Sequence, residues 1–129
     1  MPASTFPDYA QQINAIVSQL VADNQAFLLN LQIDQRSTLR GRIEGRLQFM
    51  DGSELHFREF VDLTRDEPKV AYAYHYQNAD TRMIFRYDNA AHRPAIGILD
   101  HKHMISSIEA NTPPTLLQVV DEILRRTTC

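Results

Sequence analysis

The chain has almost no cysteine and no long apolar run. Its single cysteine, Cys129, is the last of 129 residues, which excludes a disulfide within the chain and a zinc site built on cysteines. The N-terminal segment MPASTFPDY carries no basic residue ahead of its first apolar positions, so it predicts neither a signal peptide nor a membrane anchor. We therefore expect a soluble protein in the reducing cytoplasm, without membrane contact.

The chain also lacks an excess of positive charge. Its formal net charge is −3, which argues against a protein that coats nucleic acid through a global basic field. Local contact with phosphate is still compatible with the composition, because eleven of the thirteen basic residues are arginine. The planar guanidinium suits bidentate recognition of phosphate or carboxylate. A GC-rich genome that favours arginine codons is the alternative explanation.

What is present fits one folded domain over residues 1–129. The chain is long enough to bury a core, and no internal repeat, low-complexity segment or linker divides it. Hydrophobic periodicity predicts helices over 8–22 and 113–126, with Thr112 as the cap of the second. Alternation predicts strands over 26–34, 42–50, 54–63, 69–77, 82–88 and, after a loop, 96–104. The predicted fold class is α+β, an antiparallel meandering sheet of five to six strands flanked by the two helices on one face.

The first predicted hairpin places a carboxylate on the apolar face of the sheet. A three-residue loop, Asp51-Gly52-Ser53, would pair Phe49 with Leu55 and set Glu59 across from Gly45 on the apolar face. Glycine leaves that space unfilled, which predicts a recess lined by the Glu59 carboxylate. The alternative is that Glu59 lies near a sheet edge and pairs with an arginine such as Arg86.

The second predicted hairpin carries alternating tyrosines. A four-residue loop over 78–81 would place Tyr74 opposite Phe85, with His75 on the other face beside Arg86. Such a tyrosine ladder favours sheet packing over a platform for base stacking, since aromatic residues favour strands in any case.

Polar residues concentrate between Arg86 and His103. Three of the five histidines, His92, His101 and His103, fall within twelve residues. If residues 101–103 are extended, His101 and His103 project from one face while Lys102 points away. The cluster fits metal binding, in which His101 and His103 together with His92 or a carboxylate would supply three or four nitrogen and oxygen ligands for zinc or a related ion. It also fits metal-free phosphodiester cleavage, in which a base takes the ribose 2′-hydroxyl proton, an acid protonates the leaving oxygen, and cationic groups stabilise the phosphorane. A solvated loop with incidental histidines is the third interpretation.

The same region carries a resemblance to a known family. The string YHYQNADTRMIFRYDNAAHRP, then LDHKH and a closing PPTLLQVVDEIL helix, resembles the TumE-type toxins of bacterial type II toxin–antitoxin operons, over roughly residues 25 to 124. The family pattern usually reads R-[YF]-D-N-A-P-H-H followed by H-[HKR]-H. The chain departs from it at Ala91, where proline is common, and at Arg93, where a second histidine is common. The second departure weakens any mechanism or metal site that needs a tandem histidine pair. The matching positions are Arg86, Asp88, Asn89, His92, His101, Lys102 and His103.

The resemblance implies a small toxin that acts on RNA and is neutralised by a cognate helix-turn-helix antitoxin encoded beside it. Together with the polar cluster, it predicts an endoribonuclease that needs no cofactor. The candidate catalytic residues are His92, His101, His103, Asp88 and Glu59, and the candidate substrate-binding residues are Arg86, Lys102, Tyr74 and Asn89.

Two other functions stay open at this point. One is a non-catalytic module that binds the antitoxin, another partner or an anionic ligand. The other is a hydrolase that depends on a divalent metal held by His92, His101 and His103. An exposed antiparallel edge over Phe27 to Ile33 makes a homodimer a further expectation.

Overall fold

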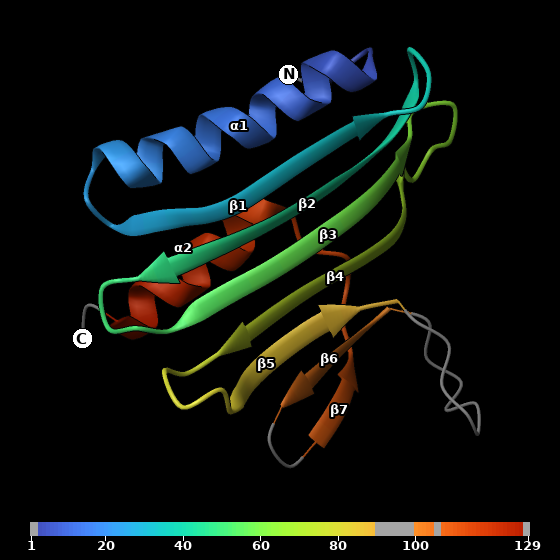
Figure 1. Ribbon diagram of the computed structural model, residues 1–129. Coiled ribbons are helices and arrows are strands. Elements are labelled where there is room, and N and C mark those ends of the chain that lie inside the picture. The colour runs from blue at the N-terminus through green and yellow to red at the C-terminus, as the bar shows by residue number, and fades with distance from the viewer. Residues whose placement is uncertain (1–2, 90–99, 105–106, 128–129) are drawn as a thin grey trace.

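The computed structural model describes residues 3–89, 100–104 and 107–127. In this part of the chain the elements are α1 (Phe6–Ala22), β1 (Ala26–Gln35), β2 (Arg40–Phe49), β3 (Glu54–Asp62), β4 (Lys69–Gln77), β5 (Met83–Asp88), β6 (His101–Met104), β7 (Ser107–Ala110) and α2 (Leu116–Thr127). The strands form one antiparallel sheet in chain order, from β1 at one edge to β7 at the other (Figure 1).

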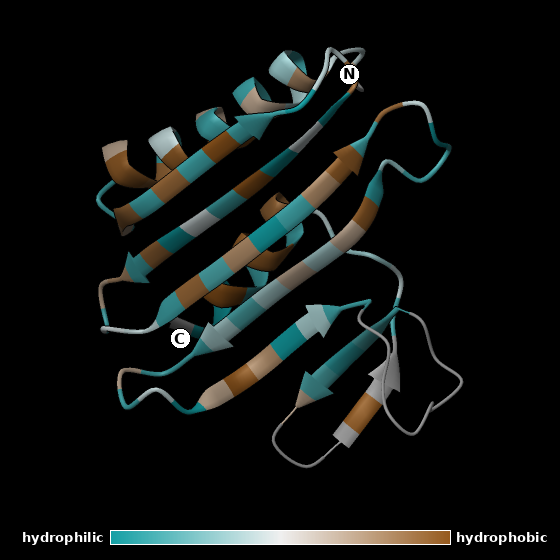
Figure 2. Ribbon diagram, turned by 45° about the vertical axis from the view of Figure 1, so that its right-hand side comes forward, coloured by the Kyte–Doolittle hydropathy of each residue, from teal (hydrophilic) through white to brown (hydrophobic). Residues whose placement is uncertain are grey.

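The predicted α+β meander is confirmed, and it has one strand more than expected. Both helices belong to the hydrophobic core on one side of the sheet (Figure 2). Apolar positions alternate with polar ones along the strands, so Leu47 and Leu55 are fully buried while the adjacent Arg46 and His56 lie on the other face. No described helix is long and apolar enough to cross a membrane.

Short polar side chains set where the helices begin. Thr5 caps α1, since its hydroxyl accepts from the Asp8 backbone N–H at 3.3 Å. The predicted cap of the second helix, Thr112, is wrong. Thr115 caps α2 instead, because its hydroxyl accepts from the Gln118 N–H at 3.1 Å while the Gln118 side chain accepts from the Thr115 N–H at 2.9 Å. This reciprocal pair satisfies two backbone N–H donors at once. The proline-rich segment before the helix does not provide such a pair.

The predicted register of the first hairpin is wrong by two residues. The loop is Met50–Gly52, closed by a bond from Phe49 N to Ser53 O of 2.8 Å. Asp51 accepts from the Ser53 N–H at 3.0 Å, and Gly52 adopts a φ of 86°, so the turn closes before Ser53. A shift of two keeps every side chain on its predicted face, and hydrophobic alternation alone does not distinguish the two registers.

This register removes the predicted recess at Gly45. Gly45 lies opposite Phe57, and Ile43 is the residue opposite Glu59. The Phe57 ring fills the space above the glycine, because a Cβ at position 45 would meet the ring at 2.5 Å.

The second hairpin also differs from its predicted register by two residues. Tyr74 lies opposite Tyr87, not Phe85, and the hairpin closes with a bond from Asn78 N to Arg82 O of 2.9 Å. The Asn78 side chain accepts from the backbone N–H groups of Asp80 and Arg82, which holds a tighter loop than the four-residue loop expected.

Replacing Gly45 by alanine should destabilise the fold. Phe57 is 2% exposed, so its ring has little room to move away from a new methyl group. Overpacking of this kind costs about 1–3 kcal/mol of unfolding free energy. Urea denaturation followed by circular dichroism measures it, with Gln48→Ala on the polar face of β2 as the control. Equal unfolding midpoints for the two variants would show that the Phe57 ring does leave room for a methyl group at position 45.

Candidate functional site

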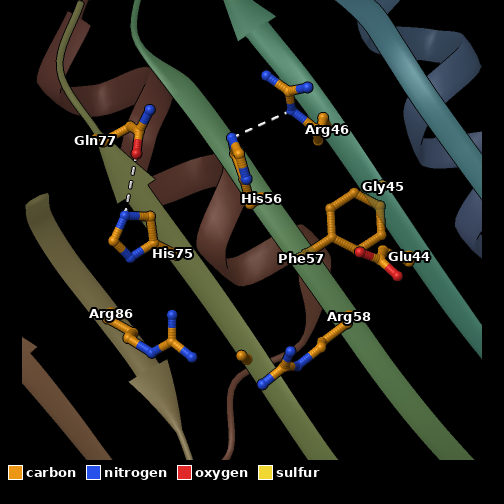
Figure 3. Close-up of a pocket in the computed structure, with 10 residues that line it drawn as sticks. Glu44, Gly45, Arg46, His56, Phe57, Arg58, His75, Gln77 and Arg86 are labelled. Carbon is orange, nitrogen blue, oxygen red and sulfur yellow. Dashed lines mark hydrogen bonds between the residues drawn. The ribbon is translucent and has the colours of Figure 1, made fainter. Parts of the chain in front are cut away.

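The sheet face turned away from the helices carries a charged groove of about 310 Å³ across β2 to β5. Strand pairing creates it, because residues directly opposite one another share a face. The groove is lined by Glu44, Arg46, His56, Arg58, Ala73, His75, Gln77 and Arg86, among others (Figure 3). Ala73, directly opposite Arg58, has a small side chain that leaves room at the groove floor.

Two rows of cross-strand neighbours run over this face from β2 to β6. The first row is Arg46, His56, His75, Arg86 and His103, and the second is Glu44, Arg58, Ala73, Asp88 and His101. The rows are predominantly basic and place the histidines of β6 beside the groove. The register therefore connects the residues of the first hairpin to the polar segment that the sequence singled out.

Asp88 is the centre of the β5–β6 end of these rows. Its Oδ2 atom lies 2.7 Å from Arg86 Nε and 3.5 Å from His103 Nε2, and its Oδ1 atom lies 2.6 Å from His101 Nε2. The centres of the His101 and His103 imidazole rings are 4.6 Å apart. Asp88 and His101 are buried, whereas the His103 side chain is 17% exposed. The structure thus brings four of the predicted site residues together on one face of the sheet.

His75 provides the centre of the groove itself. Its Nε2 atom lies 3.2 Å from the Gln77 side-chain oxygen, and its buried Nδ1 atom has no hydrogen-bond partner among the described residues. Burial and the nearby Arg86 guanidinium lower the pKa of His75 below its usual value of 6.5. The ring is therefore neutral at pH 7 and able to accept or donate a hydrogen bond.

Glu59 and Tyr74 do not belong to this site. They lie on the core face, where Glu59 is fully buried and accepts hydrogen bonds from Tyr9 and, at 2.7 Å, from Tyr74. The proposed pairing of Glu59 with Arg86 is wrong, because the guanidinium is on the opposite face and contacts Asp88. Burial and the Glu59 carboxylate raise the pKa values of both tyrosines, so these hydroxyls stay protonated as donors.

Lys102 also points away from the histidines. Its ammonium lies 3.0 Å from Glu122 on α2 and 4.8 Å from the centre of the Tyr87 ring. The Tyr87 hydroxyl donates to the same carboxylate at 2.6 Å. Lys102 therefore attaches α2 to the sheet, as its position between His101 and His103 on an extended strand requires.

The side chain of Asn89 forms hydrogen bonds with the backbone of β4. Its side-chain oxygen accepts from the Tyr72 N–H at 3.1 Å, and its amide nitrogen donates to the Val70 carbonyl at 3.0 Å. The remaining predicted site residue, His92, lies outside the described residues.

Sequence analysis did not identify the charged side of the first hairpin as part of the site. Arg46, His56 and Arg58 nevertheless line the groove. The available signal was the polar alternation of β2 and β3, together with the predicted meander, but neither gave the register between β3 and β4. The observed pairing shows that these residues converge with Arg86.

Comparison with known proteins gives one finding. A family model described as "Toxin TumE" matches residues 17–128. Neither the comparison with curated proteins nor the comparison with solved structures found a match.

Proposed function

The chain belongs to the TumE family of toxins, and we propose that it is a bacterial type II toxin that cleaves RNA by metal-independent acid–base catalysis in the cytoplasm. Membership of a toxin family implies an antitoxin partner. The helix-turn-helix character of that partner, and RNA as the substrate, are part of the proposal.

The observation that carries the proposal is the contact of one carboxylate, Asp88, with Arg86 and both β6 histidines. Cleavage of RNA by its own 2′-hydroxyl needs a base, an acid and a cation close to one phosphate. Imidazole groups supply proton transfer near neutral pH, and a carboxylate hydrogen-bonded to an imidazole orients it. Arg86 adds the positive charge at the same place.

In the proposed reaction His103 accepts the 2′-hydroxyl proton, because its side chain is 17% exposed whereas His101 is fully buried. The 2′-oxygen attacks phosphorus and forms a 2′,3′-cyclic phosphate. The bond to the 5′-oxygen breaks, and His92 donates the proton that this leaving oxygen requires. Arg86 stabilises the phosphorane, while Asp88 and His101 are positioning residues that orient His103 and Arg86.

The groove is proposed to bind the phosphates that flank the cleaved bond. Arg46 and Arg86 each have a carboxylate partner, whereas no ion pair of Arg58 occurs in the described part of the chain. Arg58 is therefore available to neutralise a phosphate, with His56 and His75 beside it. A groove across a sheet surface suits a single strand, whose backbone follows a cationic path.

Substituting His103 tests the chemistry. His103→Ala should lower the rate of RNA cleavage about 10²- to 10⁴-fold, since general-base catalysis contributes that range. Cleavage of a fluorogenic oligoribonucleotide is measured in excess chelator between pH 5 and 9. His56→Ala is the matched histidine control and should change KM more than kcat, because His56 lies in the groove at the far side of His75. Intact RNA with the wild-type protein across that pH range would overturn metal-free cleavage.

Growth inhibition distinguishes this function from a non-catalytic module. If His92→Ala and His103→Ala each left inhibition intact while Arg86→Ala abolished it, the toxin would act by binding through its cationic groove and not by acid–base catalysis.

Substituting Arg58 tests the groove. Arg58→Ala should weaken binding of single-stranded RNA and reduce the slope of log affinity against log salt by about 0.7, because one phosphate contact is lost. Fluorescence anisotropy at several salt concentrations measures both. Arg36→Ala is the control, since Arg36 is paired with Asp34 at the end of β1, away from the groove. An unchanged salt slope in Arg58→Ala would argue against phosphate binding at this position.

A homodimer through β1 is the last part of the proposal. β1 is an edge strand of ten residues, and Phe27, Leu29 and Ile33 are 58%, 45% and 45% exposed. An exposed apolar edge of this length favours pairing with another strand. Antiparallel pairing with a second copy would bring Asp23, before β1, near Arg36 of the other chain, after β1. At about 4.8 Å per strand, this edge is about 19 Å from β5, so the site stays accessible in such a dimer.

Introducing charge at the edge tests the dimer. Leu29→Lys should shift the molar mass measured by light scattering from that of two chains towards that of one. Leu117→Lys, at an equally exposed leucine on α2, is the control and should leave the mass unchanged. A wild-type chain that is monomeric at all measured concentrations would contradict the pairing.

A further inference from the structure

We infer that Asp88, His101 and His103 form a binding site for a divalent transition-metal ion such as zinc. Each residue offers one ligand atom, and these atoms lie within 4.8 Å of one another. The Asp88 oxygens lie 2.6 Å from His101 Nε2 and 3.5 Å from His103 Nε2. Ligand atoms of a tetrahedral zinc ion, at bond lengths of about 2.0–2.1 Å, are about 3.4 Å apart. Because the separations of 2.6 to 4.8 Å lie on both sides of this value, small adjustments of the three side chains bring their ligand atoms to coordination distance.

The donor set selects the kind of ion. Two imidazole nitrogens and one carboxylate suit zinc, manganese and iron(II), whereas magnesium and calcium prefer oxygen ligands. The three ligands from the described residues fill three positions of a four-coordinate ion, so a ligand such as water or an anion in the fourth position would complete it. Arg86, 2.7 Å from Asp88, orients the carboxylate as an outer partner and adds a cation next to that position.

The strands hold the three ligands in place before any ion binds. Asp88 and His101 are directly opposite residues of β5 and β6, and His101 and His103 alternate on the same face of β6. Asp88 is 4% exposed and His101 is fully buried, so the surrounding packing restricts both side chains to small movements. Of the ligand sets considered from sequence, this is the one in which a carboxylate, Asp88, joins His101 and His103, and His92 lies outside the described residues.

The ion and the proposed proton transfer compete for the same groups. A metal bound to the His103 nitrogen occupies the lone pair that the base needs, and it displaces the proton between His101 and Asp88. We therefore expect zinc to inhibit RNA cleavage and a chelator to restore it. The inhibition rests on the proposed function, whereas the metal site itself does not.

Calorimetric titration of zinc into chelator-stripped, full-length protein tests the site without reference to activity. We expect one ion per chain in the wild type and at least a tenfold weaker affinity in His103→Gln. His103→Gln is the first choice because the side chain is partly exposed, and circular dichroism verifies that it folds. Asp88→Asn is the second variant, and His56→Gln is the control, whose zinc affinity should equal that of the wild type.

The outcomes separate the site from the catalytic proposal. No zinc binding, or equal affinity in wild type and His103→Gln, overturns the metal site and leaves cleavage in chelator untouched. Zinc binding with loss of cleavage supports both. Zinc binding with cleavage only when zinc is present supports the site and overturns the metal-free mechanism.

Discussion

Both helices pack on one face of the antiparallel sheet, and the alternation of side chains along each strand sends the intervening residues to the other face. The apolar face is closed by α1, α2 and a continuous set of buried aliphatic and aromatic residues. The opposite face therefore collects arginine, histidine and acidic side chains from β2 to β6. The groove and the Asp88 cluster are consequences of this single division.

The core face contains one polar exception, a network around Glu59. Tyr9 from α1 and Tyr74 from β4 donate to the buried carboxylate, and the Lys69 ammonium lies 2.7 Å from the Tyr74 hydroxyl. Lys69 also donates to the Pro114 carbonyl just before α2. A buried carboxylate is costly unless it is hydrogen-bonded, so this network is stable only when both helical ends and the sheet are in place. The network positions the helices. This structural role accounts for the burial of Glu59, so no catalytic role is needed to explain it.

On the open face, Asp88 is the centre of a polar network, as Glu59 is in the core, but Asp88 lies where chemistry is possible. It lies between an arginine of its own strand and two histidines of the next, close to a groove that solvent reaches. The same three ligating groups suit proton transfer and metal coordination, because both need imidazole lone pairs held by a carboxylate. The two chemistries exclude each other at one site, and zinc would therefore act on the proposed reaction as a competitor for its proton-transfer groups.

The sequence alone determined the order of the elements apart from β7, the faces of the strands and the separation of Lys102 from His101 and His103. These properties depend on local periodicity, which is visible in a single strand or helix. The family resemblance to TumE toxins also came from the sequence and agrees with the match over residues 17–128.

Only the tertiary structure decided which residues meet. Hairpin registers shifted by two residues keep the same faces, so alternation could not show that Phe57 fills the space at Gly45. The hydrogen bonds of Glu59 with Tyr9 and Tyr74 in the core, and the convergence of Arg58 with Arg86, depend on strand register and on side-chain contacts between elements. Register and such contacts are set by the packing of the whole sheet against its helices.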